Sequence, residues 1–85
     1  MNSHIMRIYF KKLSLEDLKR IAVKNDIFLN DNELISTYNY IKNNYNDYID
    51  GILSEDKIIS DAYLLLEKDN YEKIYNIYLK YKKNT

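Results

Sequence analysis

Apolar residues recur every three or four positions through most of this chain, a spacing that gathers them on one face of an α-helix. Residues whose side chains accept hydrogen bonds from the first turn of a helix stand at the start of each apolar segment. The pattern predicts four helices, with Ser14, Asn30, Ser54 and Asp69 as their N-caps. Three caps have an acidic residue three positions later, as in a capping box: Ser14 with Asp17, Asn30 with Glu33 and Asp69 with Glu72.

The apolar faces of these helices give the expected core. Its positions are Leu15, Leu18, Ile21, Ala22, Leu34, Ile35, Tyr38, Ile41, Tyr45, Ile58, Ile59, Ala62, Leu65 and Leu66. Tyr40 and Leu64 fall off these faces. Residues 27–29, Ile-Phe-Leu, are too few for a helix, and we expect all three to fill the gap between the first two helices.

The sequence marks the ends of the helices less clearly than their starts. Residues 25–26, Asn-Asp, and Gly51 are expected to end the first and second helices, because these residue types tolerate left-handed backbone. The Asn-rich stretch around Asn44 favours turns, so we expect the second helix to fray or break there. Short connections predict roughly antiparallel packing of consecutive helices.

The N-terminus is interpreted apart from the rest. Residues 1–6, Met-Asn-Ser-His-Ile-Met, are typical of a vector-derived leader in front of a native start at Met6. Residues 7–12 are expected to form a short arm or turn. Residues 7–83 are then a single helical domain.

Composition supports an all-α fold, a compact bundle of about four helices. Apolar residues make up 46% of the 85, enough for a modest core. One Gly and no Pro leave few tight turns, which favours helices. No apolar run approaches the roughly 20 residues of a membrane helix, and no signal-peptide core is present. We therefore expect a cytoplasmic protein that does not enter a membrane.

Candidate chemistry is sparse. The absence of cysteine excludes disulfides, thiolate zinc sites and cysteine nucleophiles. His4 is the only histidine and falls in the predicted leader, which leaves no obvious general base near neutral pH. A calcium loop aligned on Gly51 fails, because Lys57 takes the place of the bidentate carboxylate. We expect no enzyme activity, cofactor, metal or small-molecule substrate.

The last predicted helix carries the best candidate for an interaction surface. Tyr71, Tyr75 and Tyr78 recur at helical spacing, and Tyr81 extends the row. Tyrosine suits surfaces that are only sometimes covered, because its ring is apolar and its tip polar. Two alternatives stay open. The face is core, or its tyrosines follow from a low-GC genome, since the abundant Asn, Lys, Ile and Tyr all have AT-rich codons.

The first two predicted helices and their loop resemble the SAP- and LEM-type helix-extended-loop-helix motifs. The resemblance covers the apolar positions of residues 15–22, 27–29 and 34–35, and it implies nucleic-acid binding. The phosphate contacts would be Lys19, Arg20, Lys24 and Lys42. Acidic residues at the second helix start would repel phosphate, and 13 basic against 13 acidic residues give no net attraction.

The layout from residue 13 to residue 80 also resembles a family of short uncharacterised helical proteins from low-GC Gram-positive bacteria, a domain of unknown function. The similar features are Leu-Ser-x-Glu-x-Leu at 13–18, Ile-x-Leu at 27–29 and Tyr-Ile-Lys at 40–42. This resemblance implies a fold and a lineage, and no activity. From the sequence we expect a protein-interaction module that associates with itself or another protein through the last helix, or alternatively a nucleic-acid-binding module.

Overall fold

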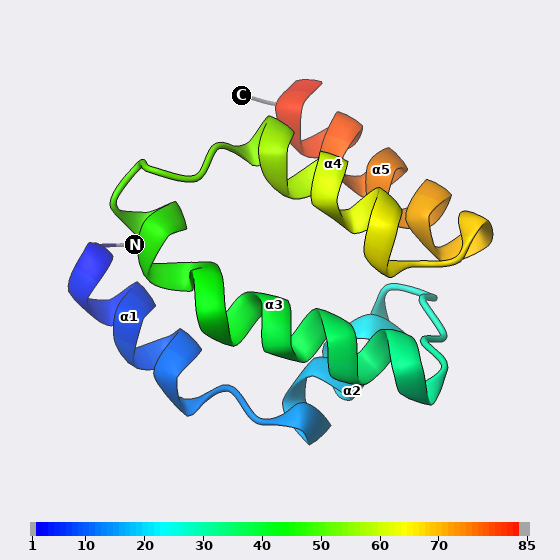
Figure 1. Cartoon of the computed structure of the whole chain (residues 1–85), viewed down its shortest axis with the longest axis horizontal. Coiled ribbons are helices and arrows are strands. Elements are labelled where there is room, and N and C mark those ends of the chain that lie inside the picture. Colours follow the sequence, from blue (N-terminus) through cyan, green and yellow to red (C-terminus); the bar gives the residue numbers. More distant parts are fainter. Residues whose placement is uncertain (1, 84–85) are drawn as a thin grey trace.

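Helix α3, Asp31–Ile49, runs through the middle of the molecule and packs against three of the other helices (Figure 1). The structure is a computed structural model that describes residues 2–83. Within them the chain forms five helices and no strands, so the all-α prediction is confirmed. The other four are α1 (Ser3–Lys12), α2 (Leu15–Lys24), α4 (Glu55–Leu65) and α5 (Lys68–Lys83). In Figure 1, α1 and α2 lie on one side of α3, and α4 with α5 on the other.

The N-terminal segment is a helix, not the short arm or turn expected of residues 7–12. Residues 3–6, part of the predicted leader, form the first turn of α1, and the side chain of Asn2 caps it by accepting from the Ile5 N–H. The prediction of about four helices was wrong by one, because setting aside residues 1–6 left a stretch too short to form a helix. Met1 lies outside the described residues, and the vector-derived origin of residues 1–6 stays a prediction.

The other end of α1 is fixed by a side chain from α3. The ammonium group of Lys42 donates to the carbonyl oxygens of Phe10 at 2.9 Å, Lys11 at 2.8 Å and Leu13 at 3.1 Å. Tyr38, one turn earlier on α3, donates its hydroxyl to the Leu13 carbonyl at 3.2 Å. A cation on the last carbonyls of a helix satisfies acceptors that lack a partner and complements the helix dipole.

The buried apolar residues all lie in one part of the chain. They are Leu13, Leu18, Ala22, Ile27 and Leu34. Helix α2, the loops beside it and the start of α3 therefore supply the best-packed core. The loop between α2 and α3 follows the prediction only in part, because Ile27 is buried while Phe28 is 64% exposed. Ile21 and Ile35, also expected in the core, are exposed.

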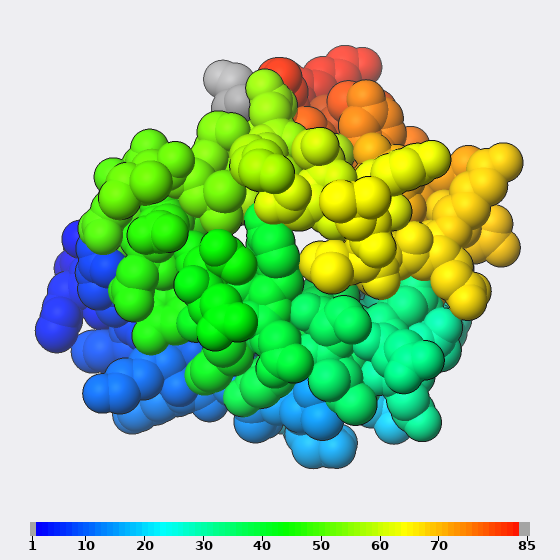
Figure 2. Space-filling model, in the orientation of Figure 1, coloured from blue at the N-terminus to red at the C-terminus, as the bar shows by residue number. Residues whose placement is uncertain are grey.

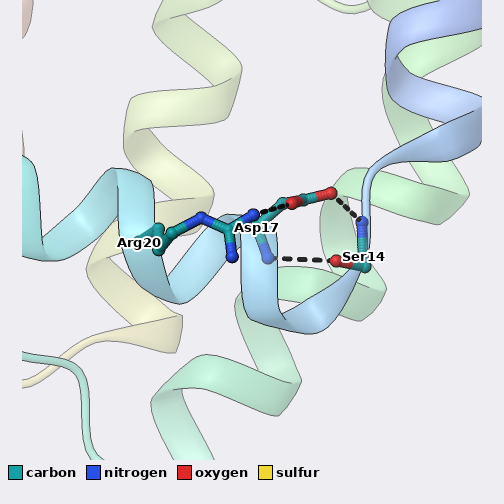
Figure 3. A network of polar contacts seen from close by, with 3 residues as sticks. All are labelled: Ser14, Asp17 and Arg20. Atoms are coloured by element: carbon teal, nitrogen blue, oxygen red, sulfur yellow. Dashed lines mark hydrogen bonds and ion pairs between the residues drawn. The ribbon is translucent and has the colours of Figure 1, made fainter.

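The starts of α2 and α3 are capped as the sequence predicts. In α2 the hydroxyl of Ser14 accepts from the Asp17 N–H, and the Asp17 carboxylate accepts from the Ser14 N–H, both at 3.0 Å (Figure 3). The bond from the Ser14 backbone holds the pKa of Asp17 below its usual value. Arg20 forms an ion pair with the same carboxylate. Asn30 and Glu33 form the second capping box.

The helix ends agree with some expectations and correct others. Helix α3 continues through Asn44 without a break, since the Asn44 amide donates to the Tyr40 carbonyl at 2.8 Å instead of forming a turn. Gly51 follows the end of α3 with a φ of 77°, which confirms the predicted stop. Helix α5 begins at residue 68 and not after Asp69. Among residues 2–83, no helix has both the length and the hydrophobicity to cross a membrane.

Candidate functional site

Four tyrosines form a continuous row across the α4–α5 hairpin. The ring centroids of Tyr63 and Tyr71 are 5.2 Å apart, those of Tyr71 and Tyr75 are 5.9 Å apart, and those of Tyr75 and Tyr78 are 6.5 Å apart. The first pair meets edge to face and the second is stacked. Both are geometries that aromatic rings prefer. We call this set the tyrosine row.

The structure brings together three of the predicted interaction residues and adds one that the sequence analysis missed. Tyr71, Tyr75 and Tyr78 belong to the row, whereas Tyr81 lies beyond its end and is exposed. Tyr63 comes from α4 and is 67% exposed. It stands outside the apolar face of its own helix. Only the pairing of α4 with α5 reveals that it continues a row on the neighbouring helix.

The Tyr78 end of the tyrosine row is held in place by a hydrogen bond. The Tyr78 hydroxyl donates to Asp56 on α4 at 2.8 Å. This bond, together with burial, raises the pKa of Tyr78 above its usual value. Beside the row, Leu64 is 81% exposed, which confirms that it points away from the core. The hairpin thus presents ordered aromatic rings next to uncovered apolar surface.

The basic residues of the alternative site fall into two groups. Lys19, Arg20 and Lys24 lie exposed on α2, and Arg20 is paired with Asp17 (Figure 3). Lys42 lies on α3, where its ammonium group contacts the carbonyls that end α1. A phosphate contact by Lys42 would have to replace these bonds.

A buried carboxylate joins the beginnings of two helices. Glu33, 4% exposed, accepts from the N–H of Asn30 at 3.0 Å and from the N–H of Glu67, just before α5, at 2.8 Å. The amide group of Asn70 donates to its two oxygens at 3.0 and 3.2 Å. The same amide reaches the Phe28 carbonyl at 3.1 Å. We call Glu33, Glu67 and Asn70 the carboxylate clasp.

The carboxylate clasp attaches the start of α5 to the start of α3. Hydrogen bonds to a charged group are worth about 1.5–3 kcal/mol when buried, and a carboxylate is also favoured beside a helix N-terminus. The sequence predicted Glu33 as a cap of its own helix, which is confirmed. Asn70 is 37 positions away, and no local pattern connects the two residues.

A second polar contact holds α4 against α3. The Tyr40 hydroxyl donates to Asp61 at 2.6 Å, and Lys57 donates to the same carboxylate at 2.6 Å. Burial, with the bond to Asp61, raises the pKa of Tyr40 to about 12. The donors Lys57 and Tyr40 lower the pKa of Asp61. Tyr40 was expected off the apolar face that carries Tyr38, and it packs against α4, whereas Tyr38 bonds to Leu13, because α3 packs against helices on both sides.

An apolar cavity of about 270 Å³ lies between α3 and the hairpin, and Tyr40 of the contact between α3 and α4 forms part of its wall. Figure 2 shows an opening between the green surface of α3 and the yellow surface of α4. The cavity is lined by Phe10, Thr37, Tyr40, Ile41, Asn44, Tyr45, Tyr48, Leu53, Ile58, Ala62, Leu65, Leu66 and Ile74. None of these side chains is a Lys, Arg, Asp or Glu, so the cavity walls provide no charge.

Within residues 2–83, no three His, Asp or Glu side chains are grouped so that they could hold a metal ion. Comparison with protein-family models, with curated proteins and with solved structures finds no match for this chain.

Proposed function

We propose that this chain is a small protein-interaction module that self-associates through the tyrosine row of the α4–α5 hairpin. The observation that carries the proposal is the row itself, four neighbouring rings from two helices that meet edge to face, stacked and tilted in turn, with Tyr63 exposed at one end. Tyrosines are enriched at protein interfaces, where they often supply a large share of the binding energy.

Order within the row favours binding. A side chain that is already held in one rotamer loses little conformational freedom when a partner covers it. The rings of Tyr71 and Tyr75 hold each other, and Tyr78 is held by Asp56. A second copy would therefore meet a surface that needs little reorganisation. A two-fold arrangement allows the same row to serve both copies.

Sedimentation equilibrium tests the proposal. The wild-type chain is expected to show a concentration-dependent mass above 10.3 kDa. Changing Tyr75→Ala together with Tyr78→Ala is expected to return it to the monomer. Since loss of Tyr78 also removes a bond to Asp56, Leu64→Glu provides a second variant that places a charge beside the row on an exposed position.

The matched control is Tyr9→Ala, which removes an exposed tyrosine from α1, on the other side of α3. It is expected to leave the mass of the assembly unchanged. A wild-type chain that stays monomeric at millimolar concentration would reject self-association. An equal effect of the Tyr9 change would reject the row as the interface.

A further inference from the structure

We propose that the groove between α1 and α2 is a docking site for a short acidic peptide segment of a partner protein, with an apolar side chain among its carboxylates. The site is independent of the tyrosine row, because the groove and the row lie on opposite sides of α3 (Figure 1). The basic charge of this part of the chain, the cations that line the groove and the apolar wall beside them support the proposal.

The charges of this neutral chain are unevenly distributed. Residues 1–24 contain six Lys and Arg against two Asp and Glu, a net charge of +4. Residues 25–85 contain seven against eleven, a net charge of −4. Interactions between exposed charges that are more than about 8 Å apart are largely screened at physiological salt. A ligand at α1 and α2 therefore meets a basic surface, although the chain as a whole is neutral.

Cations from two helices line the same groove. Helices α1 and α2 each pack against α3 and leave a groove of about 350 Å³ between them. Lys12 of α1 lines it together with Arg20 and Lys24, which share one face of α2. All three side chains are exposed, and among residues 2–83 neither lysine is in an ion pair.

The acidic residue of the groove wall is already engaged. The Asp17 carboxylate accepts from the Ser14 N–H and pairs with Arg20 (Figure 3). An exposed pair of this kind contributes little to stability, and a guanidinium group has five N–H donors, so Arg20 keeps donors for a second carboxylate. Three cations against one carboxylate leave the groove an excess of two positive charges.

The rest of the groove wall is apolar. It consists of Tyr9, Leu13 and Ile21, of which Tyr9 is 49% and Ile21 39% exposed. A small inorganic anion would leave this surface uncovered, whereas a peptide covers it with an apolar side chain and reaches the cations with carboxylates. The groove volume is at the low end of the range for ligand sites. It therefore suits one apolar side chain with parts of its neighbours.

A nucleic acid fits this surface less well than an acidic peptide does. Its affinity depends on many phosphates that are neutralised by an extended set of Lys and Arg. Here residues 25–85 are acidic overall, so the basic surface is confined to α1 and α2. Phosphates would also meet the Asp17 carboxylate. A short acidic peptide needs only the few cations that the groove has.

The anisotropy of a fluorescein-labelled Glu-Glu-Leu-Glu-Glu peptide tests the site. The wild-type chain is expected to bind one peptide, about three- to tenfold more tightly than the same peptide with Ser in place of Leu. Binding is expected to weaken as salt is added. Absence of saturable binding at millimolar protein would overturn the proposal, and so would equal affinity for the two peptides.

Two double variants of equal charge test the location. Lys12→Ala with Lys24→Ala is expected to weaken the leucine peptide by about tenfold. Lys11→Ala with Lys19→Ala removes the same charge from the same two helices outside the groove, and is expected to change binding by about twofold or less. All four side chains are exposed, so the fold is expected to be retained, which circular dichroism checks. Equal losses in the two double variants would overturn the assignment to the groove.

The apolar contact has its own pair of variants. Ile21→Ser is expected to abolish the preference for the leucine peptide, because this side chain lines the groove. Val23→Ser changes an exposed apolar residue of the same helix outside the groove and is expected to keep the preference. A preference that is the same in both variants would contradict the proposed contact.

Two further measurements separate the acidic peptide from other occupants. An oligothymidylate of equal charge is expected to bind more weakly than the leucine peptide, and tighter binding would overturn the proposal in favour of nucleic acid. Leu64→Glu, the variant designed to prevent self-association, is expected to bind the peptide like the wild type, so the two proposals can fail separately. Peptide binding that is lost as the chain associates would mean that a second copy fills the groove, and would overturn the proposal.

Discussion

The two sides of α3 are held together in different ways. On one side, α2 with its flanking loops supplies four of the five buried apolar residues of the described chain, and the fifth, Leu34, lies at the start of α3. On the other side, α4 has no buried residue and the only buried residue of α5 is the polar Asn70. The hairpin is attached by hydrogen bonds and lies over a cavity. The best-packed apolar core therefore lies on one side of α3, and the cavity lies on the other.

This contrast agrees with a general feature of proteins, in which binding regions come from the less stable parts of the structure. The tyrosine row and the cavity both lie on the hairpin side. The same apolar residue type should therefore contribute a different amount to the free energy of unfolding on the two sides of α3. The polar contacts of the hairpin should contribute a large share of the stability on their side.

Leucine-to-alanine changes should show the largest difference. Leu34→Ala is expected to lower the free energy of unfolding by about 3 kcal/mol, since its side chain is buried on all sides. Leu66→Ala should cost about 1 kcal/mol, because one side of this residue already faces the cavity. Exposed Leu64→Ala should stay within about 0.5 kcal/mol. Urea unfolding measures all three, and equal costs for Leu34 and Leu66 would contradict the contrast.

Breaking the carboxylate clasp should have the next largest effect. Glu33→Gln keeps the shape of the side chain but removes the charge that four hydrogen bonds share. We expect a loss of about 2 kcal/mol in the free energy of unfolding. Asp31→Asn, an exposed change in the same helical turn, serves as the control and should cost about 0.5 kcal/mol or less. An equal loss in both variants would mean that Glu33 acts only through the helix dipole.

Much of the local structure could be predicted from the sequence, because the signals are themselves local. The capping boxes at Ser14 and Asn30, the N-cap at Ser54 and the stop at Gly51 all depend on residues within a few positions of each other. Helix α1 was not predicted, because part of what stabilises it comes from a residue far away in the sequence. Lys42, 29 to 32 positions away, provides the cap for its last turn.

In the candidate sites, too, the features set by neighbouring residues were predicted and those set by distant residues were not. Spacing along α5 found Tyr71, Tyr75 and Tyr78, but Tyr63 joins the row only through the packing of two helices. Asn70 was not predicted for the same reason. The cavity has no signature in the sequence, because a void depends on how well distant side chains fit each other. Some of its lining residues, such as Ile41, Tyr45 and Ile58, were expected in the core, whereas Tyr40 and Asn44 were not.

The polar contact between α3 and α4 should show in the alkaline range. The folded pKa of Tyr40, about 12, lies above the ordinary tyrosine value of 10.0, so the folded state holds this proton more tightly. The contribution is fully present below pH 10 and is lost as the pH rises from about 10 to 12. We expect a loss of roughly 1 kcal/mol from this group, since solvent screens a half-buried phenol.

Tyr40→Phe should make this alkaline decline less steep in urea unfolding measured as a function of pH. Some decline should remain, because the pKa values of Tyr48 and Tyr78 are raised as well. Tyr9→Phe, on exposed α1, is the control and should leave the decline unchanged. The idea fails if the two phenylalanine variants follow the same curve between pH 10 and 12.

Native-state hydrogen exchange most directly tests whether the two sides of α3 differ in this way. The amides of α2 and of the first turns of α3 should open only with global unfolding, whereas those of α4 and α5 should exchange through a smaller opening of lower free energy. Glu33→Gln should further lower the opening free energies of the amides in α4 and α5, and it should change those of α2 less. Equal opening free energies across all helices, in the wild type and in the variant, would contradict the account.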